Sequence, residues 1–307
     1  MEIVNLSAEP LGKLYSWLPH DLKAESVVFL PDACPGKSPL PTGTAVFTKQ
    51  SDWRRFAVSD CGCGMRLVKS NLNTDDLTAD LWDAIAGTIK QNKGGLGDLG
   101  GGNHFLDALL PFDDDTIYFL IHTGSRKESG IVDELVDKPV LFDREFESVV
   151  DWAESNRAAI QSTIEKQIGA TELLMDLPHN TYEKLDDGVV IRKGSIRLKP
   201  GELSILPSHM SGDVSLVSAT DRIAETLFSM SHGTGRTMSR SDAKDTARTF
   251  DFESLRRQVI MPSFLNPASL NTEGPFAYRN LDDCLALIEG YAVEVKRFSV
   301  VAYMGHL

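Results

Sequence analysis

Four short strands that follow one long helix constrain the fold more than any other feature of this sequence. Each strand is rich in β-branched or large apolar residues and is bounded by glycine, proline or polar residues: Val189 to Arg192, Ser195 to Leu198, Leu203 to Leu206 and Val214 to Ser218. The spacing of apolar residues before them predicts a helix from Asp143 to Ile168. Because helices and strands are grouped rather than strictly alternating, the pattern predicts an α+β fold.

Two polar residues interrupt the apolar stripe of the predicted helix. The stripe consists of Phe146, Val149, Ala153, Ile160 and Ile164, and Asn156 and Arg157 break it. Polar groups on an apolar face need partners. Arg157 either lays its stem on the core and reaches water, as long cationic side chains often do, or has a further role.

The first third of the chain is punctuated by glycine and proline, which predicts short strands and loops. Thr74 to Asp76 offer a cap for a helix whose apolar face carries Leu77, Leu81, Ile85 and Ile89. Thr116 to Ile121 predict a buried strand that delivers His122 at its end.

The composition is that of an ordinary folded protein, with 42% hydrophobic and 24% charged residues among 307. No stretch approaches the roughly 20 apolar residues that a membrane span requires, and the first residues lack the features of a secretory signal. We therefore expect a cytoplasmic protein without a membrane partner. The four cysteines, Cys34, Cys61, Cys63 and Cys284, are expected to be free thiols or metal ligands.

The net charge of −13 counts against extended nonspecific binding of nucleic acid, which is normally made by clustered lysine and arginine. Any RNA contact must then be local. The candidate basic groups are Arg192, Lys193, Arg197 and Lys199, and, further on, Arg236 with Arg240. From charge alone, a solvated strand face explains the first group equally well.

Several histidines stand beside glycine or small polar residues, as residues of functional loops often do. They are His104, His122, His179 and His232. A single histidine in such a place is more often structural than a ligand. Asp60 and Cys63 add a carboxylate and a thiol within a glycine-containing turn. Because no second closely spaced Cys or His pair completes a structural zinc site, these scattered residues suggest an open, catalytic metal site.

The segment from Gly94 to His104 contains six glycines among its first nine residues and can approach phosphates through its backbone amides. It lacks the Gly-Lys-Ser/Thr ending of a P-loop, and a flexible turn is the alternative interpretation.

Taken together and in order, these motifs resemble those of the RtcB family of RNA ligases. The matching segments are Pro31-Asp32 with Gly36, Asp60 with Gly62 to Met65, Gly100 to Phe105, His122 to Arg126, Asn156-Arg157, His179-Asn180, Arg192 to Gly194, Ser231 to Arg236, and Pro275 with Tyr278. The resemblance implies a single domain over residues 1–307, with mixed and antiparallel β-sheets surrounded by helices and the site in a central cleft.

The resemblance also implies two Mn²⁺ ions that share Cys63. Asp60 and His104 would complete one site, and His122 and His179 the other. Carboxylate and imidazole suit Mn(II), but the thiolate suits zinc as well, so the residue types alone do not identify the metal.

His232 matches the family histidine that attacks the α-phosphorus of GTP. The GMP then passes to an RNA 3′-phosphate, formed from a 2′,3′-cyclic phosphate, and a 5′-hydroxyl displaces it. An activating protein partner is a further expectation from the family. The implied nucleotide-binding residues are Asn103, His104, Phe105, Leu106, Asp107, His179, Asn180, Pro207, Ser208, His209, Met210, Ser215, His232, Gly233, Thr234 and Gly235. The candidate RNA contacts are Arg126, Arg157, Arg192, Lys193 and Arg236, and Arg157 has a structural role as its alternative.

The chain departs from the family pattern at three places around the nucleotide. The family's Pro-Gly-Ser-Met-Gly segment appears as Pro207 to Gly212, the usual glutamate is Asp107, and no lysine stands at the Met304-to-Leu307 end. Two alternatives to a ligase therefore stay open. They are a catalytically silent RNA-binding relative and a metal-dependent cyclic phosphodiesterase that uses no nucleotide.

Overall fold

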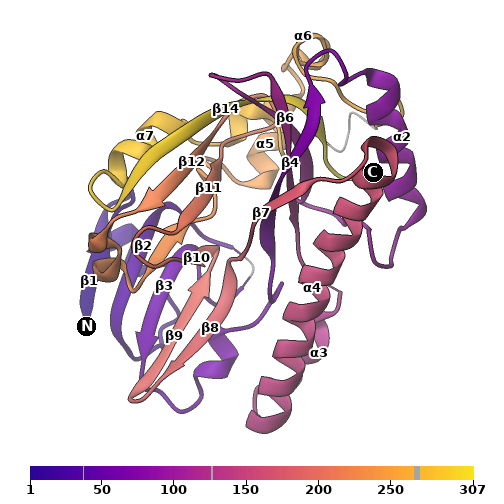
Figure 1. The fold of residues 1–307 in the computed structure, drawn as a ribbon. Helices are drawn as coiled ribbons and strands as arrows, with labels where there is room; N and C mark the ends of the chain where they lie inside the picture. The colour runs from indigo at the N-terminus through magenta and orange to yellow at the C-terminus, as the bar shows by residue number, and fades with distance from the viewer. Residues whose placement is uncertain (37, 126, 266–269) are drawn as a thin grey trace.

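Two β-sheets and one long helix organise the chain (Figure 1). The computed structural model describes residues 1–36, 38–125, 127–265 and 270–307. The smaller sheet has the strand order β1-β2-β3-β9-β8. Its strands are β1 (Glu2–Asn5), β2 (Ala24–Cys34), β3 (Thr42–Thr48), β8 (Asn180–Leu185) and β9 (Gly188–Lys193). Only the β1–β2 pair among these described strands is parallel.

The larger sheet has seven antiparallel strands in the order β11-β12-β14-β5-β6-β4-β7. They are β4 (Gly64–Asn73), β5 (Phe105–Pro111), β6 (Thr116–Thr123), β7 (Glu172–Pro178), β11 (Leu203–Pro207), β12 (Asp213–Ala219) and β14 (Ala292–Met304). A short ribbon of β10 (Ser195–Arg197) and β13 (Ser229–Ser231) is separate from both sheets. The predicted α+β fold is confirmed.

Seven helices and three 3₁₀ turns are named among the described residues. They are α1 (Leu11–Tyr15), α2 (Ala79–Gln91), α3 (Ser129–Asp133), α4 (Pro139–Ile168), α5 (Arg240–Ala247), α6 (Phe252–Gln258) and α7 (Leu281–Leu287), with 3₁₀ turns η1 (Trp53–Phe56), η2 (Asp221–Thr226) and η4 (Pro275–Ala277). None of the helices in the described residues is both long enough and apolar enough to cross a membrane.

Helix α4 connects the hydrophobic cores of the two sheets. Its first half places Phe142 and Phe146 in the core of the smaller sheet, and its second half places Ile160 and Ile164 against the larger one. Because strand residues alternate in direction, one face of the larger sheet packs on α2 and α4. The opposite face carries a second core and the polar groups of the site.

Most predicted elements are found, with shifted ends. Helix α4 begins at Pro139, four residues before the predicted start, with proline in the first turn, where a missing N–H costs nothing. The predicted cap at Thr74 to Asp76 is wrong. Thr78 caps α2 by accepting from Leu81 N–H at 3.2 Å. The side chain of Asn73 instead closes the preceding turn by accepting from the amides of Asp75 and Asp76.

Two strands are longer than predicted. β6 continues through His122 to Thr123, so this histidine is held by a strand rather than a loop. β2 has 11 residues, although the glycine and proline content of this region predicted short strands. Its pairing with β3 is interrupted between Phe29 and Cys34, and this irregularity accommodates Pro31.

Candidate active site

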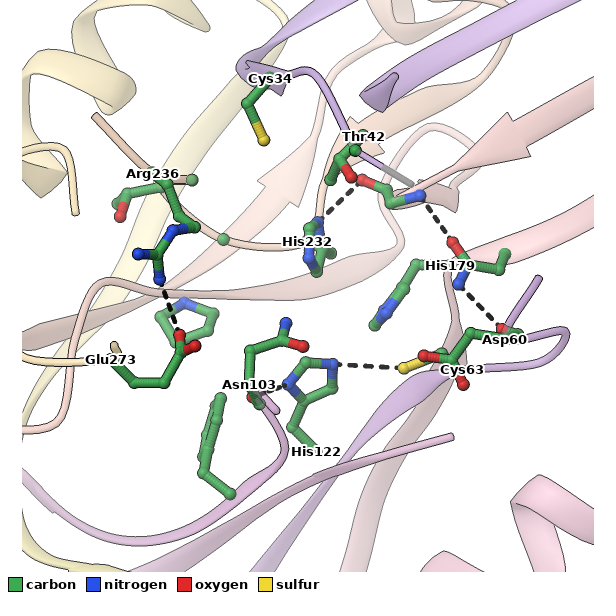
Figure 2. Close-up of a pocket in the computed structure, with 18 of the residues that line it drawn as sticks. Cys34, Thr42, Asp60, Cys63, Asn103, His122, His179, His232, Arg236 and Glu273 are labelled. Carbon is green, nitrogen blue, oxygen red and sulfur yellow. Dashed lines mark hydrogen bonds and ion pairs between the residues drawn. The ribbon is translucent and has the colours of Figure 1, made fainter. Parts of the chain in front are cut away.

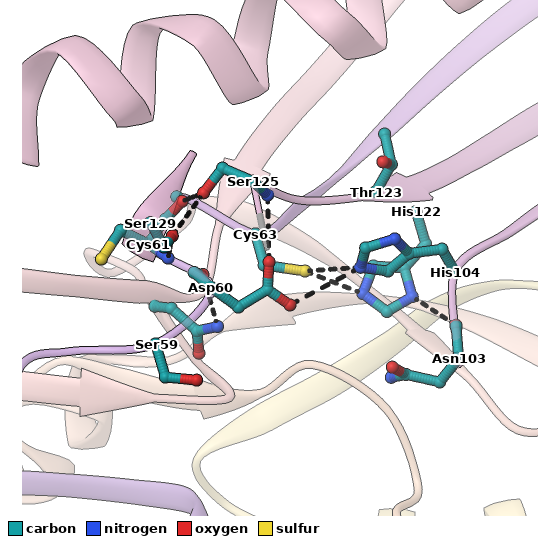
Figure 3. Close-up of polar contacts among 12 residues, drawn as sticks. Ser59, Asp60, Cys61, Cys63, Asn103, His104, His122, Thr123, Ser125 and Ser129 are labelled. Atoms are coloured by element: carbon teal, nitrogen blue, oxygen red, sulfur yellow. Dashed lines mark hydrogen bonds and ion pairs between the residues drawn. The ribbon is translucent and has the colours of Figure 1, made fainter. Parts of the chain in front are cut away.

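The turn before β4 has an unusual backbone that directs Asp60 and Cys63 to the same place. Ser59 and Asp60 have φ values of 74° and 55°, and Gly62 has 69°. Non-glycine residues rarely adopt this left-handed region, so the surrounding bonds must hold it. The amide of Ser125 donates to Asp60 Oδ1 at 3.0 Å, and the side chain of Asn180 donates to the Asp60 carbonyl at 2.8 Å (Figure 3).

Two histidines present the same ring nitrogen to the Cys63 thiol. His104 Nδ1 lies 3.1 Å from the Leu99 carbonyl, and His122 Nδ1 lies 3.1 Å from the Asn103 carbonyl. Because a carbonyl oxygen only accepts, each Nδ1 carries the proton and each Nε2 keeps a lone pair. The Nε2 atoms of His104 and His122 lie 3.7 and 3.4 Å from Cys63 Sγ (Figure 3).

His179 joins this cluster from the junction of β7 and β8. Its ring centroid lies 5.1 Å from that of His122, and its backbone N–H donates to the Cys63 carbonyl at 2.7 Å. Burial, reinforced by neighbouring cationic groups, lowers the pKa of His179 well below its usual value. A neutral imidazole is the form that binds metal. Within the described residues, its buried Nδ1 has no hydrogen-bond partner.

The five side chains form two groups that could each hold a metal ion. One group is Asp60, Cys63 and His104; the other is Cys63, His122 and His179. In each, the ligand atoms lie within 4.8 Å of one another. This is the division that the resemblance implies. Gly124 keeps the space open, since a Cβ at this position would contact Asp60 Oδ1 and approach Cys63 Sγ to 2.9 Å.

The donor atoms of each group fit a divalent cation, and Cys63 belongs to both groups. Buried imidazoles with fixed ring orientation and an adjacent carboxylate are ordinary ligands of Mn, Fe and Zn. Each three-residue group leaves coordination positions for a substrate oxygen, as catalytic sites require.

His232 lies beside the cluster, with its ring centroid 4.4 Å from that of His179 (Figure 2). Its Nδ1 lies 2.7 Å from Asp32 Oδ2 and 2.9 Å from the Gly194 carbonyl, and Asp32 is fully buried. Since both partners accept, Nδ1 carries the proton and Nε2 is left with its lone pair. Gly194 has φ 60°, and a Cβ there would approach His232 Cε1 to 3.1 Å.

A cleft of about 560 Å³ joins the cluster, His232 and most predicted nucleotide-binding residues. Those that line it are Asn103, Phe105, Asp107, His179, Asn180, Pro207, Ser208, His209, Met210, His232, Gly233, Thr234 and Gly235. Such a volume matches the size of small-molecule sites.

Comparison with known proteins identifies the family. A family model described as "tRNA-splicing ligase RtcB" matches residues 144–304, just over half of the chain. The chain belongs to the RtcB family. RNA-splicing ligase RtcB2 of Escherichia coli is similar to it, with 26% identity over 90% of this chain and 87% of the relative. RNA-splicing ligase RtcB of Escherichia coli K12 is 24% identical over 85% of each chain. tRNA-splicing ligase RtcB of Nanoarchaeum equitans is 26% identical over 72% of this chain and 62% of the relative.

Two predicted nucleotide-binding side chains point away from the RtcB cleft. Leu106 is fully buried in the core under α2 and α4, because it lies between Phe105 and Asp107 on the strand and must face the opposite side. Ser215 is fully buried within β12. Neither side chain lines the cleft, and the assignment of both residues to the nucleotide site stays a prediction. His104, assigned to both nucleotide and metal, is buried in the metal group.

Two of the predicted RNA-binding arginines are structural. Arg157 is 1% exposed, binds Asp176 at 2.7 Å and donates to the carbonyls of Gly62 and Thr123, so it neither reaches water nor faces RNA. Arg192 is 2% exposed and is bound by Glu183 and by the Leu227 carbonyl. Both guanidinium groups are buried with protein partners, which for Arg157 is the structural role named as its alternative.

The remaining candidate RNA-binding residues differ from Arg157 and Arg192 in their position. Lys193 and Arg236 line the cleft, and Arg236 Nη1 donates to Glu273 at 2.9 Å (Figure 2). Lys193 donates to the Ser59 carbonyl, and burial lowers its pKa. Arg126 lies outside the described residues.

Asp32 and Glu273 have no role in the prediction from sequence, although Asp32 bonds to His232 and Glu273 lines the cleft. Pro31-Asp32 belongs to the matched motifs, but 200 residues separate Asp32 from His232, so no spacing rule links them. Glu273 is 4% exposed and accepts from Arg236, Arg240 and Tyr278. The nearby motif residues Pro275 and Tyr278 were the signal in the sequence that could have pointed to Glu273.

Proposed function

We propose that this chain, as one domain over residues 1–307, is a GTP- and Mn(II)-dependent RNA ligase that works through guanylylated His232. It joins RNA ends with a 2′,3′-cyclic phosphate or 3′-phosphate to ends with a 5′-hydroxyl, in RNA splicing or repair. The names of the E. coli and N. equitans relatives support RNA ligation. The observation that carries the proposal is the Asp32–His232 bond beside the two ligand groups.

His232 has the geometry of a nucleophile. With the proton on Nδ1 held by Asp32 and Gly194, Nε2 can attack the α-phosphorus of GTP, and pyrophosphate leaves as the N–P bond forms. The imidazole ring then becomes cationic, and the buried carboxylate of Asp32 stabilises that charge. This arrangement favours the ligase over a phosphodiesterase without nucleotide, because hydrolysis of a cyclic phosphate requires no oriented histidine nucleophile.

The later steps are phosphoryl transfers that need orientation and charge neutralisation. An oxygen of the RNA 3′-phosphate attacks the histidine-bound phosphorus, and His232 leaves with its electron pair restored. The 5′-hydroxyl then attacks the 3′-phosphorus, and GMP leaves as the strand is sealed. Divalent cations, when bound, neutralise phosphate charge. Asp60, Cys63, His104, His122 and His179 would hold them. Arg236 and Arg240, which line the same cleft, would face the RNA ends.

The test is covalent labelling with α-³²P-labelled GTP in Mn(II). The expected result is an acid-labile label on the wild type that His232→Ala abolishes. His20→Ala, at an exposed histidine far along the chain from the site, is the matched control and should label normally. A label that persists in His232→Ala rejects the assignment.

A second assay follows sealing of an RNA with 2′,3′-cyclic phosphate and 5′-hydroxyl ends. Sealing that depends on GTP and His232 supports the ligase. Binding of RNA and Mn(II) without any label supports the silent relative, and hydrolysis of the cyclic phosphate without GTP supports the phosphodiesterase. An activating protein partner is a further part of the proposal, and it would act by accelerating labelling.

A further inference from the structure

Glu273 is a buried carboxylate in the wall of the cleft, and four donors surround it. It is 4% exposed and lines the cleft. Its Oε2 accepts from Arg236 Nη1 at 2.9 Å and from the Tyr278 hydroxyl. Its Oε1 accepts from Arg240 Nε and from the Thr272 hydroxyl, each at 3.1 Å. Because two of these partners are guanidinium groups, which only donate, the carboxyl group is ionised and acts as an acceptor.

An anion at this place is unexpected from charge alone. The cleft also contains His232, and under the proposed function it receives a nucleotide and RNA, which are both polyanions. A buried carboxylate repels phosphate and loses its hydration, so the groups that it holds must offset this cost. Those groups are two arginines, and one carboxylate with two guanidinium groups leaves one net positive charge.

Glu273 joins two arginines that come from different elements. Arg236 lies after β13, and Arg240 is the first residue of α5. Two guanidinium groups repel each other when they are close, and a carboxylate between them removes this repulsion and fixes both. Arg236 is fixed further, because its Nε donates to the Met238 carbonyl at 3.2 Å and its guanidinium group lies 5.4 Å from the ring centroid of Tyr278.

The two arginines are held in a way that suits a phosphate ligand. Arg236 Nη2 is buried, and within the described residues it has no hydrogen-bond partner, which is costly unless a ligand supplies one. Arg240 contacts Glu273 through Nε, on the side of its guanidinium group, and its side chain is 50% exposed. Both arginines line the cleft, and in Figure 2 Arg236 and Glu273 lie apart from Cys63. A guanidinium group binds phosphate through two N–H groups only when its plane is correctly oriented.

We propose that Glu273 is a positioning residue that fixes Arg236 and Arg240 as one phosphate-binding pair for an RNA end. The inference rests on the proposed function for the identity of the ligand. It does not depend on the covalent step at His232, so the two proposals can fail separately.

Charge and orientation predict opposite results when Glu273 becomes neutral. The experiment measures equilibrium binding of a short single-stranded RNA with a 5′-hydroxyl end, in Mn(II), to the full chain carrying His232→Ala. Removal of an anion would by itself tighten binding of RNA. We expect Glu273→Gln instead to weaken it about tenfold, the loss of about one charge-assisted hydrogen bond. Glu253→Gln, at an exposed position of α6, removes the same charge and should leave the affinity unchanged. Unchanged or tighter binding in Glu273→Gln overturns the inference.

A double-mutant cycle shows whether Glu273 acts through the arginines. Arg240→Gln alone should also weaken RNA binding about tenfold. Because the carboxylate acts by holding the guanidinium group, the double variant should lose little more than the weaker-binding single variant. Losses that multiply to about 100-fold would show that the two side chains act independently, and this result overturns the inference.

Arg240→Lys keeps both the charge and Glu273, and it tests the same point should Glu273→Gln not fold. A single ammonium group cannot bind Glu273 and also present an oriented fork of donors, so RNA binding should weaken about tenfold although the charge is unchanged. An affinity equal to that of the unmodified pair overturns the inference.

Sealing kinetics with His232 intact separate the two proposals. Glu273→Gln should raise the KM for RNA more than it lowers kcat, and a fall in kcat with KM unchanged overturns the positioning role. RNA binding that depends on Glu273, without labelling of His232, rejects the proposed function and leaves the positioning role standing. Labelling and sealing with RNA binding that does not depend on Glu273 does the reverse. Failure of the RNA to bind at all overturns both.

Discussion

Three histidines of the site are oriented by the same physical device at the level of single atoms. His104, His122 and His232 each place Nδ1 against a backbone carbonyl, which fixes the proton there and leaves Nε2 available. For His104 and His122, Nε2 faces the thiol of Cys63. His232 differs by one additional partner, the Asp32 carboxylate. Under the proposed function, this additional carboxylate suits a nucleophile rather than a metal ligand, because only the nucleophile gains positive charge as it reacts.

Asp32→Asn is expected to slow labelling of His232 by about 10²- to 10⁴-fold, the range for loss of an orienting carboxylate or an acid–base partner. The carboxylate that stabilises the cationic ring is lost, while the Gly194 carbonyl still orients Nδ1. GTP binding and Mn(II) binding should be unchanged, which a merely structural role would not predict. Asp21→Asn, at an exposed carboxylate that pairs with Arg55, serves as the control. Normal labelling kinetics in Asp32→Asn would rule out this charge-stabilising role of Asp32.

Asp107→Asn is expected to change stability in a way that depends on pH. Burial raises the folded-state pKa of Asp107 above the unfolded value of about 3.9, so the folded chain holds this proton more tightly. The stability of the wild type therefore falls as pH rises from about 4 toward the folded pKa, whereas asparagine does not titrate. In thermal unfolding, the melting temperature of the variant relative to the wild type should rise between pH 5 and pH 8. A difference that stays constant over this range would contradict the shift.

The residues that the sequence could and could not predict differ in a physical way. Motif residues that carry their own chemistry, such as Cys63 and His122, were identifiable because their types and neighbours restrict what they do. The side-chain direction of Leu106 could also have been predicted, because alternation along a strand places it on the face opposite to Phe105 and Asp107. The bond between His232 and Asp32 could not be predicted from the sequence. The two residues are 200 positions apart, and their contact depends on how β2 packs against the segment after β13.

At the scale of elements, helix α4 supports the segments that carry the candidate metal ligands. Arg157 on α4 donates to the carbonyls of Gly62 and Thr123, which lie next to Cys63 and His122, and pairs with Asp176 on β7. Asn156 donates to the Asp98 carbonyl and accepts from Gly97 N–H, which fixes the glycine-rich segment. The two polar residues that interrupted the apolar stripe thus find their partners in the loops that carry the ligands.

Arg157→Met is expected to destabilise the fold by about 3–5 kcal/mol, because it leaves Asp176 with one fewer buried partner and two carbonyls unsatisfied. Mn(II) affinity should fall with it, since the turn of Asp60 to Cys63 loses support. Denaturant unfolding and metal titration measure the two effects. Arg144→Met, at an exposed position of the same helix, should change neither beyond about 0.5 kcal/mol. Unaltered metal affinity in a folded Arg157→Met would show that Arg157 does not support the turn of Asp60 to Cys63.

At the scale of the whole molecule, the net charge of −13 limits how RNA is held. Lys193, Arg236 and Arg240 are the basic side chains that line the cleft among the described residues. Three phosphate contacts on a single strand give a slope of log K against log salt of about −2. Binding of an RNA end measured from 50 to 300 mM salt should show this shallow slope. A much steeper slope would reveal an extended basic surface and contradict recognition confined to the ends.

The metal ligands join segments from across the chain, so metal binding should stabilise the molecule as a whole. They come from the turn before β4, from the segment before β5, from β6 and from the β7–β8 junction. Because the unfolded chain has no such site, Mn(II) at 100 times its dissociation constant should add about 2.7 kcal/mol and raise the melting temperature, and a chelator should reverse it.

The number of Mn(II) ions bound per chain tests whether the two ligand groups share the thiolate of Cys63. Two Mn(II) per chain are expected for the wild type. His179→Ala should retain one ion, because the group of Asp60, Cys63 and His104 is untouched, whereas Cys63→Ala removes a ligand from both groups and should lose both. His306→Ala, at an exposed histidine near the end of the chain, should bind two. Metal content of the purified variants measures this directly. A Cys63→Ala protein that still binds two ions would show that the two groups do not depend on a common sulfur.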